Sequence, residues 1–551
     1  MDCLIIGYSQ PNRQRERQQF FHQKERDDGQ GFGRYLRVNF LEFENDILLP
    51  NHVASLAEKI VNGQKIEKTK EGYFKEADIT SYSSWQVPLL GSLFLYQYLL
   101  KNSFDVGYVK HAQLNRDKLD AFLSLSPKVI AISTTLILHP LDIGEVVLYC
   151  RERSPDSFIV LGGMTVWTEY LAKQNDTKQF AVYGADAVVL DSRAFRTLGK
   201  LVEAVKNAKS LDNVPNLLRT RGRSKGYTFR QEEAFDFNKD IMDWGAVSEE
   251  IYGKITWVQT QKSCPFKCSF CSFPVNQGSV LRAGMDVVEA ELDTLHSLGV
   301  KYLMFVDDTF NVPKTRFEKI LNLLKKYDFG WYSFIRSQYL GPEHVRDMKA
   351  SGCMGAYLGI EAATDAMLIN MDKNVTVNDY RKGIEMLKAA DIPIYGSFVI
   401  GFPGETEETI QNSKDFIESS GIDYYALKGF YYDHCTPIHA RRSEFDLSGN
   451  RFVWQHANMS SNEAFNWIEK LIQEIDLPHL PQNGGELWEL AYFYDRGFSE
   501  KQVNALYRTF TLMQKESFAN GPEKNITQQN LLNSFATTLG ENTSVKQIIN
   551  F

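Results

Sequence analysis

The sequence predicts an α/β protein with two successive parallel-sheet units and a helical region after them. Three observations lead to this prediction. Apolar runs of strand length alternate with helical patterns between residues 88 and 205, and the same alternation begins again near residue 246. Strands buried on both faces read as unbroken apolar runs, which is typical of parallel sheets covered by helices. Beyond residue 440 the patterns are polar and helical.

Composition narrows the class of protein. The chain has 551 residues, of which 43% are hydrophobic, so we expect two or three domains. Its net charge of −8 disfavours binding to the negatively charged phosphate backbone of nucleic acid, so we expect no nucleic-acid partner. The longest apolar stretch (88–100) contains Gln97 and is too short for a bilayer. The start of the sequence lacks the basic region of a signal peptide, so we expect a cytoplasmic protein without membrane association.

The first unit begins with a buried strand at 2–9. Residues 10–34 are charged and show little periodicity, which predicts a long inserted loop, and 35–85 allow no assignment. Helices and strands then alternate, with helices expected at 88–102, 116–126 and 144–154 and strands at 104–111, 128–136, 158–164 and 181–190. This order predicts a Rossmann-like open parallel sheet over residues 1–205, with a ligand beyond the carboxyl ends of its strands.

Hydroxyl and glycine residues stand where two of these strands end. Ser133, Thr134 and Thr135 lie at the end of one strand, and Gly162 and Gly163 lie at the end of the next. They are candidate ligand contacts at the carboxyl edge of the sheet. The plainer alternative, with about equal weight, is that they are turn residues.

Residues 206–245 are predicted to be a connector that contains a short hairpin. Six strands are expected after it, each followed by a helical pattern, at 254–261, 302–310, 331–338, 355–363, 392–405 and 423–432. This repeat predicts a partial (β/α)6 barrel over 246–440, with its site at the carboxyl rim of the strands. Residues 441–551 are predicted to form a mainly helical domain.

Three of the seven cysteines lie in the segment KSCPFKCSFC, as Cys264, Cys268 and Cys271. An odd total makes a secreted disulfide framework improbable, so the cluster is predicted to bind metal. Structural zinc commonly takes two close pairs of ligands, whereas Cys353 and Cys435 have no near neighbour to pair with. An iron–sulfur cluster is the stronger hypothesis, because three cysteines can hold three irons of a cubane and leave the fourth open.

The spacing Cys264-x3-Cys268-x2-Cys271, with Phe270 before the last cysteine, resembles the signature of radical SAM enzymes. Further segments, VDDTF (306–310), GIEAATDAML (359–368) and VIGFPGET (399–406), lie at the spacings of later barrel strands of that family. The resemblance implies a [4Fe–4S] cluster whose open iron binds S-adenosylmethionine (SAM). One-electron reduction then cleaves SAM to methionine and a 5′-deoxyadenosyl radical.

The resemblance also implies roles for single residues. Phe270 would lie near the adenine of SAM, as would Val399 to Gly401. Glu361 would contact the ribose or the amino end, and Arg336 would pair with the carboxylate, whose shape matches a guanidinium fork. For each residue the plainer alternative is a salt bridge or turn at a strand end.

The family's usual Gly-Gly-Glu after the second strand is absent here. VDDTF stands in its place, so Asp308, or Asp307 beside it, is the candidate for recognition of the SAM amino group.

A parallel-sheet domain directly before such a barrel resembles the cobalamin-dependent subclass of radical SAM enzymes. In that subclass a Pro-x-x-Gly, here Pro88 to Gly91, opens the first helix. The segments AISTT and LGGM, which hold Ser133, Thr134, Thr135, Gly162, Gly163 and Met164, would cradle the corrin ring and its nucleotide tail. No Asp-x-His-x-x-Gly occurs, so no histidine would bind cobalt from below. The alternative is a sheet that binds no cobalamin.

The resemblance implies a methyltransferase that acts on an unactivated carbon, or on phosphorus, of a biosynthetic intermediate or a peptide, free or carrier-bound. Flavodoxin or ferredoxin would supply electrons. The main alternative is cyclisation or rearrangement without methyl transfer. A methylthiotransferase would need more cysteines for a second cluster than the Cys3 and Cys150 of the first unit. The non-enzymatic alternative is a zinc-stabilised binding protein.

Overall fold

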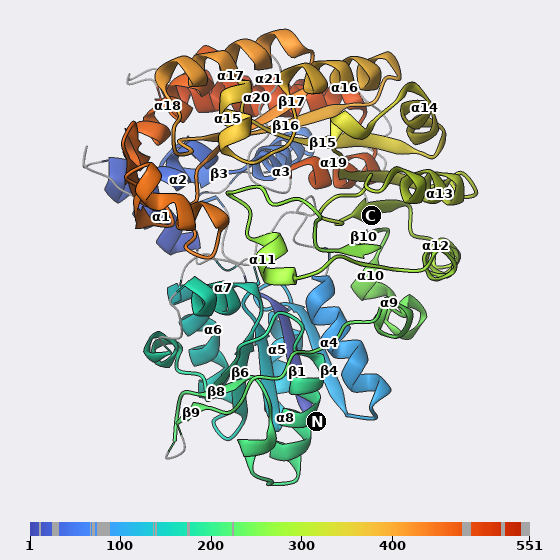
Figure 1. Ribbon diagram of the computed structural model, residues 1–551. Coiled ribbons are helices and arrows are strands. Elements are labelled where there is room, and N and C mark those ends of the chain that lie inside the picture. The colour runs from blue at the N-terminus through green and yellow to red at the C-terminus, as the bar shows by residue number, and fades with distance from the viewer. Residues whose placement is uncertain are drawn as a thin grey trace. The chain divides into compact units, whose positions relative to one another are not determined.

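The structure is a computed structural model of the chain (Figure 1). It describes residues 1–9, 13–24, 32–64, 66, 68, 72–73, 87, 89–135, 137, 140–172, 177–222, 225–475, 486–518 and 524–540. The chain divides into two compact units. The first unit comprises Met1–Asn12, Trp85–Ser263 and Ser272–Val300, and the second Arg13–Ser84, Cys264–Cys271 and Lys301–Phe551. The domain boundaries expected at 205, 245 and 440 stay predictions.

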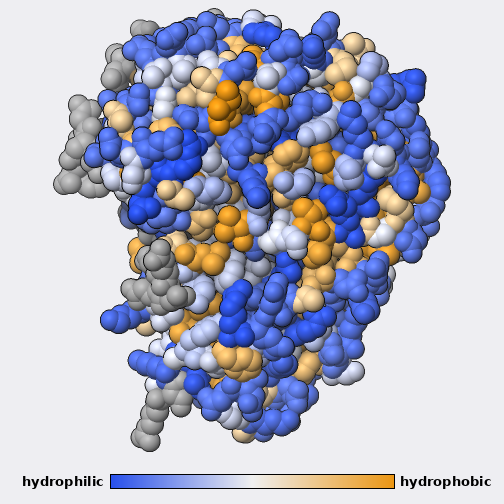
Figure 2. Space-filling model, in the orientation of Figure 1, coloured by the Kyte–Doolittle hydropathy of each residue, from blue (hydrophilic) through white to orange (hydrophobic). Residues whose placement is uncertain are grey.

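The surface is largely hydrophilic on the face drawn in Figure 2, where apolar residues occur in small separate groups. Within the described ranges, none of the helices combines the length and the apolar content needed to cross a membrane.

The first unit is built on a seven-stranded sheet of order β4-β1-β5-β6-β7-β8-β9. The first five strands are parallel: β4 (Val106–His111), β1 (Cys3–Tyr8), β5 (Val129–Ser133), β6 (Phe158–Gly162) and β7 (Ala187–Val189). The predicted Rossmann-like sheet is therefore confirmed. The chain order reverses at β1, between β4 and β5. In open α/β sheets such a switch point marks where ligands bind.

Helices alternate with the strands of the first unit. Between the parallel strands stand α4 (Leu90–Lys101), α5 (Arg116–Ser124), α6 (Pro140–Arg153) and α7 (Met164–Ala172), and α8 (Phe195–Lys206) follows β7. The hairpin expected in the connector is present as β8 (Leu217–Arg219) and β9 (Gly226–Tyr227). Its strand β8 pairs antiparallel with β7, so the hairpin extends the sheet.

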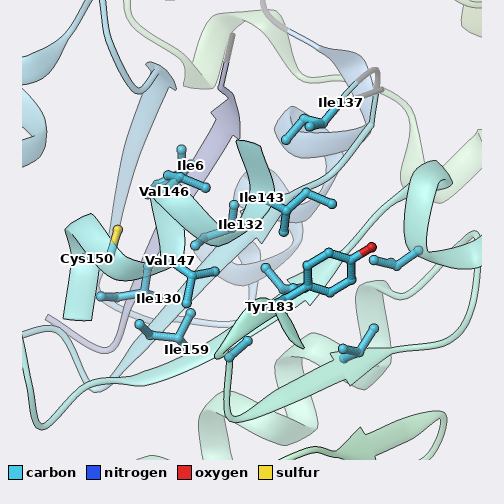
Figure 3. Packing of buried hydrophobic residues seen from close by; sticks show 14 of the residues in the cluster. Ile6, Ile130, Ile132, Ile137, Ile143, Val146, Val147, Cys150, Ile159 and Tyr183 are labelled. Atoms are coloured by element: carbon cyan, nitrogen blue, oxygen red, sulfur yellow. The ribbon is translucent and has the colours of Figure 1, made fainter. Parts of the chain in front are cut away.

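The core of the first unit lies between the strands and α6. Figure 3 shows Val147 and Cys150 of α6 close to Ile130 and Ile159 of the sheet, and Val146 close to Ile6, in one buried cluster. Burying an aliphatic side chain of this size stabilises the fold by roughly 1.5–3 kcal/mol. The unbroken apolar strands of the sequence are explained by this burial.

The prediction of a loop over 10–34 is wrong for the residues of that range that the structure describes. They form α1 (Arg13–Lys24) and the start of α2 (Phe32–Asn39). Phe20 packs with Leu36, Phe40 and Ile47 in a small cluster of its own. With so few apolar residues, the helix α1 depends on this tertiary packing, and its sequence carries almost no helical period.

The second unit contains the parallel strands β13 (Tyr302–Phe305), β14 (Gly330–Phe334), β15 (Cys353–Glu361), β16 (Ile394–Ile400) and β17 (Tyr424–Gly429), paired in chain order. The helices between them are α13 (Lys314–Leu324), α14 (Pro342–Ala350), α15 (Asp365–Asn370), α16 (Val377–Ala389) and α17 (Glu407–Ser420). The sixth expected strand, β10 (Ile255–Val258), and the helix α12 (Met285–Ser297) precede them in the chain. The predicted partial barrel is confirmed.

The C-terminal region is helical, as predicted, with α18 (Ser461–Glu474), α19 (Glu486–Asp495), α20 (Glu500–Phe518) and α21 (Lys524–Gly540). A small sheet, β18 (Ser448–Asn450), β19 (Val453–His456) and β20 (Met459–Ser460), precedes it. An N-terminal segment, with β2 (Leu41–Phe43), β3 (Asp46–Leu48) and α3 (Pro50–Val61), packs on α20 and α21 (Figure 1). Gln528 Nε2 donates to Glu42 O at 2.9 Å, and Lys524 Nζ lies 3.0 Å from the Glu42 carboxylate.

Candidate functional site

The three clustered cysteines lie on a loop of the second unit, at residues 264–271. Cys264 Sγ is 2.9 Å from Thr309 Oγ1, which follows β13. Cys268 is buried, and this burial raises the pKa of its thiol, although the nearby cations of Lys373 and Arg336 oppose the shift. Cys271 N donates to Cys268 O at 3.0 Å, which closes the loop into a tight turn.

Ser269 holds this loop in place through three hydrogen bonds. Its backbone N donates to Met371 O at 2.8 Å, and its Oγ donates to Asn370 O at 3.1 Å. Ile438 N, at the start of the 3-10 helix η6 (Pro437–Glu444), donates to Ser269 O at 2.8 Å. Arg441 Nη1 also reaches Asn370 O, at 2.9 Å. The end of α15 and η6 therefore hold the cysteine loop together.

We expect Ser269→Ala to loosen the cysteine loop without unfolding the protein, because only the Oγ bond to Asn370 is lost. Such a bond contributes about 0.5–1 kcal/mol, which corresponds to about a two- to fivefold faster loss of cluster iron to a chelator. The rate of iron release from the reconstituted protein measures this. Ser517→Ala, which removes a similar bond to Gln514 O in α20, is the control. Equal release rates for Ser269→Ala and the parent would show that Ser269 does not hold the loop.

Arg336, which follows β14, lies beside the second cysteine. Its Nη2 is 3.8 Å from Cys268 Sγ and donates to Lys373 O at 2.8 Å. The guanidinium is centred 3.6 Å from the centre of the Phe266 ring. Its Nη1 is buried and has no hydrogen-bond partner among the residues that the structure describes. A buried, unpaired guanidinium nitrogen is costly, and a carboxylate is the group that best satisfies it.

Glu361 ends β15 in a left-handed conformation, with φ of 67°. Its Oε1 lies 2.8 Å from Lys373 Nζ. A Cβ on Gly359 would displace both the Glu361 carboxylate and the Lys373 ammonium, so a glycine makes room for this pair. Tyr380 Oη donates to Gly359 O at 2.9 Å. A left-handed non-glycine residue at a strand end is strained, and such strain is concentrated at functional sites.

The residues expected around the adenine lie near the end of β16. Phe270 and Phe402 pack edge to face, with ring centres 6.4 Å apart. Gly401 has φ of +89°, and a Cβ there would lie 2.5 Å from the Trp454 ring, so only glycine fits. Val399 is half-buried on β16, two residues earlier. The structure thus brings Phe270 beside the segment that follows Gly401.

Asp308 and its neighbour Asp307 follow β13. Asp307 is buried, and Asp308 is half-buried with its backbone O accepting from Thr309 Oγ1 at 2.7 Å. Thr309 in turn contacts Cys264, so this turn adjoins the cysteine loop.

The candidate residues of the first unit come together at the carboxyl ends of β5 and β6. Thr134 donates to Gly162 O from N at 2.7 Å and from Oγ1 at 2.9 Å. Met164 N donates to Thr135 Oγ1 at 3.3 Å. Gly163 has φ of +108°, and a Cβ there would lie 2.8 Å from Thr135 Oγ1 and 3.0 Å from Thr135 N. The two loops are therefore interlocked next to the β1/β5 switch point.

Ser133, Gly91 and Pro88 are the other positions of the first unit that the resemblance singles out. Ser133 Oγ accepts weakly from Thr135 N, at 3.4 Å. Gly91 is exposed on the first turn of α4, and Pro88 lies outside the described residues.

Within the described ranges, no three Cys, His, Asp or Glu side chains stand close enough to share one metal ion.

Comparison with known families identifies the domain that carries the cysteine loop. The model of the radical SAM superfamily matches residues 258–417, which include the cysteine loop and β13 to β16. The chain contains a radical SAM domain.

Two curated relatives match parts of the chain. One is an uncharacterised methyltransferase of Pyrococcus horikoshii, 33% identical over 171 residues, which are 30% of this chain and 37% of that protein. The other is the tRNA-2-methylthio-N(6)-dimethylallyladenosine synthase of Pseudomonas aeruginosa, 25% identical over 297 residues, or 50% of this chain and 63% of that protein. The chain thus spans less than two thirds of either relative's length.

Among solved structures, the radical S-adenosylmethionine methyltransferase TsrM from Kitasatospora setae has a similar fold. That structure was solved with cobalamin and a [4Fe-4S] cluster bound. The TM-score is 0.58 at 14% identity, and the match covers 82% of this chain and 97% of that chain. The likeness extends well beyond the radical SAM domain and shows a shared fold.

Lys373 is the residue of the radical SAM domain that sequence reasoning missed. It lies in the segment NMDKN, twelve positions after Glu361, where no periodicity or motif marks it. Burial, the largest single influence, would lower the pKa of Lys373, but the carboxylate of Glu361 acts together with Tyr380 and Cys268, and the pKa is raised. The ammonium therefore stays charged inside the domain.

Glu405, in the turn after β16, is a second buried titratable group of the radical SAM domain. Burial raises the pKa of Glu405 to about 8, although hydrogen bonds from the backbone N–H groups of Gly401 and Phe402 oppose the shift. Within the described part of the chain, its Oε1 has no hydrogen-bond partner. At neutral pH this carboxyl group is therefore mostly protonated.

We expect Glu405 to make stability depend on pH. The folded state keeps the proton up to about pH 8, whereas the unfolded state loses it above its ordinary pKa of 4.5. The unfolded state thus binds fewer protons in this window, and the free energy of unfolding falls as pH rises, by up to about 1.4 kcal/mol per pH unit. Denaturant unfolding at pH 5, 7 and 8.5 should show that Glu405→Gln is less sensitive to pH than the parent. Parallel pH profiles for the two proteins would contradict this.

Proposed function

We propose that this chain is a cobalamin-dependent radical SAM methyltransferase that acts on an unactivated carbon, or on phosphorus, of a biosynthetic intermediate or a peptide. The observation that carries the proposal is the run of contacts from Cys268 to Arg336, Lys373 and Glu361 at the carboxyl ends of β14 and β15. It joins a cysteine triplet, an unpaired guanidinium and a fixed carboxylate in one site.

The residues of this site fit a cluster and SAM. When bound, a [4Fe–4S] cluster with SAM supplies a one-electron cleavage that yields a 5′-deoxyadenosyl radical. Cys264, Cys268 and Cys271 would hold the cluster as thiolates. The unpaired Arg336 Nη1 would bind the SAM carboxylate, and Glu361 the ribose or the amino end.

The remaining residues would shape and close the same site. Phe270 would lie along the adenine, with Val399 and Gly401 beside it. Asp308 is the candidate for the SAM amino group, since it follows β13 next to Thr309, which contacts Cys264. Apolar walls of this kind exclude water from a reactive radical.

The first unit would hold the cobalamin. When bound, cobalamin supplies a transferable methyl group. The loops of Thr135, Gly162 and Gly163, which the buried Thr134 holds together, offer a hydroxyl group and closely approachable backbone at a switch point. Ser133 and Met164 flank them. The cobalamin bound in the similar fold of TsrM supports this assignment.

The match to a tRNA-2-methylthio-N(6)-dimethylallyladenosine synthase suggests methylthio transfer as a second candidate function. Such an enzyme needs a second cluster, for which the first unit offers only Cys3 and Cys150. Both are fully buried, and burial raises the pKa of the Cys150 thiol to about 12. Two cysteines are fewer than the three that hold a cluster of this kind, so methyl transfer is favoured.

The partners that fit this function are a small-molecule or peptide substrate, free or carrier-bound, and a one-electron donor such as flavodoxin or ferredoxin. A cytoplasmic setting fits the oxygen sensitivity of such a cluster.

The products formed from SAM test the proposal without knowledge of the substrate. The reconstituted protein is incubated anaerobically with SAM and a strong reductant, with and without loaded hydroxocobalamin. We expect 5′-deoxyadenosine in both cases and S-adenosylhomocysteine only with cobalamin. 5′-Deoxyadenosine alone in both cases would favour rearrangement over methyl transfer, and neither product would contradict radical SAM chemistry.

A further inference from the structure

We propose that Lys373 is a positioning residue that holds Glu361 and Arg336 in the geometry that binds SAM. The inference rests on the proposed function, in which those two residues contact SAM. It goes further in assigning the orientation of the SAM site to a residue outside the motifs of the radical SAM domain.

Lys373 contacts three of the residues assigned to SAM. Its Nζ is 2.8 Å from Glu361 Oε1, and both side chains are only 11% exposed. Its backbone O accepts from Arg336 Nη2 at 2.8 Å. Its Nζ also lies 5.5 Å from the centre of the Phe270 ring. One side chain and one carbonyl therefore link groups from β14, β15 and the cysteine loop.

The backbone at Lys373 is held in a tight turn after α15. Its neighbours Asp372 and Asn374 are both left-handed, with φ of 50° and 54°. Lys373 N donates to Leu368 O at 3.0 Å. Left-handed non-glycine residues are costly and persist where the surroundings fix them. The carbonyl that receives Arg336 is thereby presented in one direction.

The ion pair explains why Glu361 can be buried at a strand end. A buried carboxylate that loses its partner is strongly destabilised, because it keeps its desolvation cost without the compensating charge. The other nearby cation, Arg336, uses Nη2 for the Lys373 carbonyl and leaves Nη1 unpaired. With Lys373 neutralising Glu361, Arg336 stays available for the carboxylate of SAM.

Substitution of Lys373 tests this role through SAM affinity. SAM binding to the reconstituted, cluster-loaded protein is measured by equilibrium dialysis, together with iron content and melting temperature. We expect Lys373→Met to weaken SAM binding about 10- to 100-fold at unchanged iron content, the range typical of partners that orient a binding group. Lys373→Arg, which keeps the charge, should recover most of the affinity. The control is Lys414→Met, which removes a 3.2 Å pair with Glu474 on α18 and should leave the affinity unchanged.

A double variant separates positioning from an independent contact. If Lys373 acts through Glu361, then Glu361→Gln combined with Lys373→Met should bind SAM no more weakly than the worse single variant. Losses that multiply would overturn the inference, as would Lys373→Met binding within about twofold of the parent. If Lys373→Met loses iron or melts early, Lys373→Gln, which keeps a hydrogen-bond donor, replaces it with the same expected outcomes. A parent that binds no SAM would instead refute the proposed function.

Discussion

Alanine in place of Cys264, Cys268 or Cys271 is expected to abolish cleavage of SAM. Each thiolate would hold a different iron, so two remaining thiolates cannot retain a stable cubane with one open iron. Iron and sulfide content, the electron paramagnetic resonance signal of the reduced cluster and 5′-deoxyadenosine formation should all collapse together. The fold should survive, because the loop is also held through the backbone of Ser269.

Two other cysteines of the second unit serve as controls for this prediction. Cys353 is buried, and burial raises the pKa of its thiol to about 12. Cys435 is half-buried, and burial and then the carboxylate of Asp433 raise the pKa of its thiol. Neither belongs to the cysteine loop at 264–271, so Cys353→Ala and Cys435→Ala are expected to keep full iron content. Iron loss in Cys435→Ala equal to that in the triplet variants would contradict a three-cysteine site.

Gly163→Val is expected to abolish cobalamin retention by the first unit. Valine cannot adopt φ of +108° without strain, and its Cβ would press on the backbone N of Thr135. Relief requires the two loops to separate, which destroys the arrangement of Thr134 and Gly162. The corrinoid that remains after desalting, read by absorbance, measures the effect.

The matched control for Gly163→Val lies in the same unit. Gly144 is inside α6, and a Cβ there meets nothing within 4 Å. Gly144→Ala should therefore bind cobalamin normally and gain about 0.5–1 kcal/mol of stability from helix propensity. Cobalamin bound by Gly163→Val at the parent level would contradict the assignment of these loops.

The sequence predicted those features that depend on local pattern. The strands of both sheets were identifiable because burial on two faces makes them continuous apolar runs. The triplet of cysteines was identifiable because its ligands lie within eight positions. Glu361 and Arg336 were assigned through the resemblance to radical SAM enzymes, and both lie near the carboxyl ends of predicted strands, where a site of this architecture is expected.

The features that were missed depend on contacts between distant segments. Lys373 is important because the turn after α15 brings its side chain into contact with Glu361. Nothing in the segment NMDKN indicates this contact. Ser269 is held by Ile438, which lies far along the chain. The sequence of α1 predicts a loop because its buried aromatic residue Phe20 finds its partners only in the folded protein. Pattern reasoning detects periodicity and motifs, whereas these residues acquire their roles through tertiary contacts.

The most direct test of the central claim is to count both cofactors in one preparation. The protein is purified anaerobically, reconstituted with iron and sulfide in the presence of hydroxocobalamin, desalted, and analysed for iron, corrinoid and absorbance. We predict about four irons and about one corrinoid per chain. Four irons without corrinoid would contradict the cobalamin assignment, and tightly bound zinc in place of iron would contradict the radical SAM site itself.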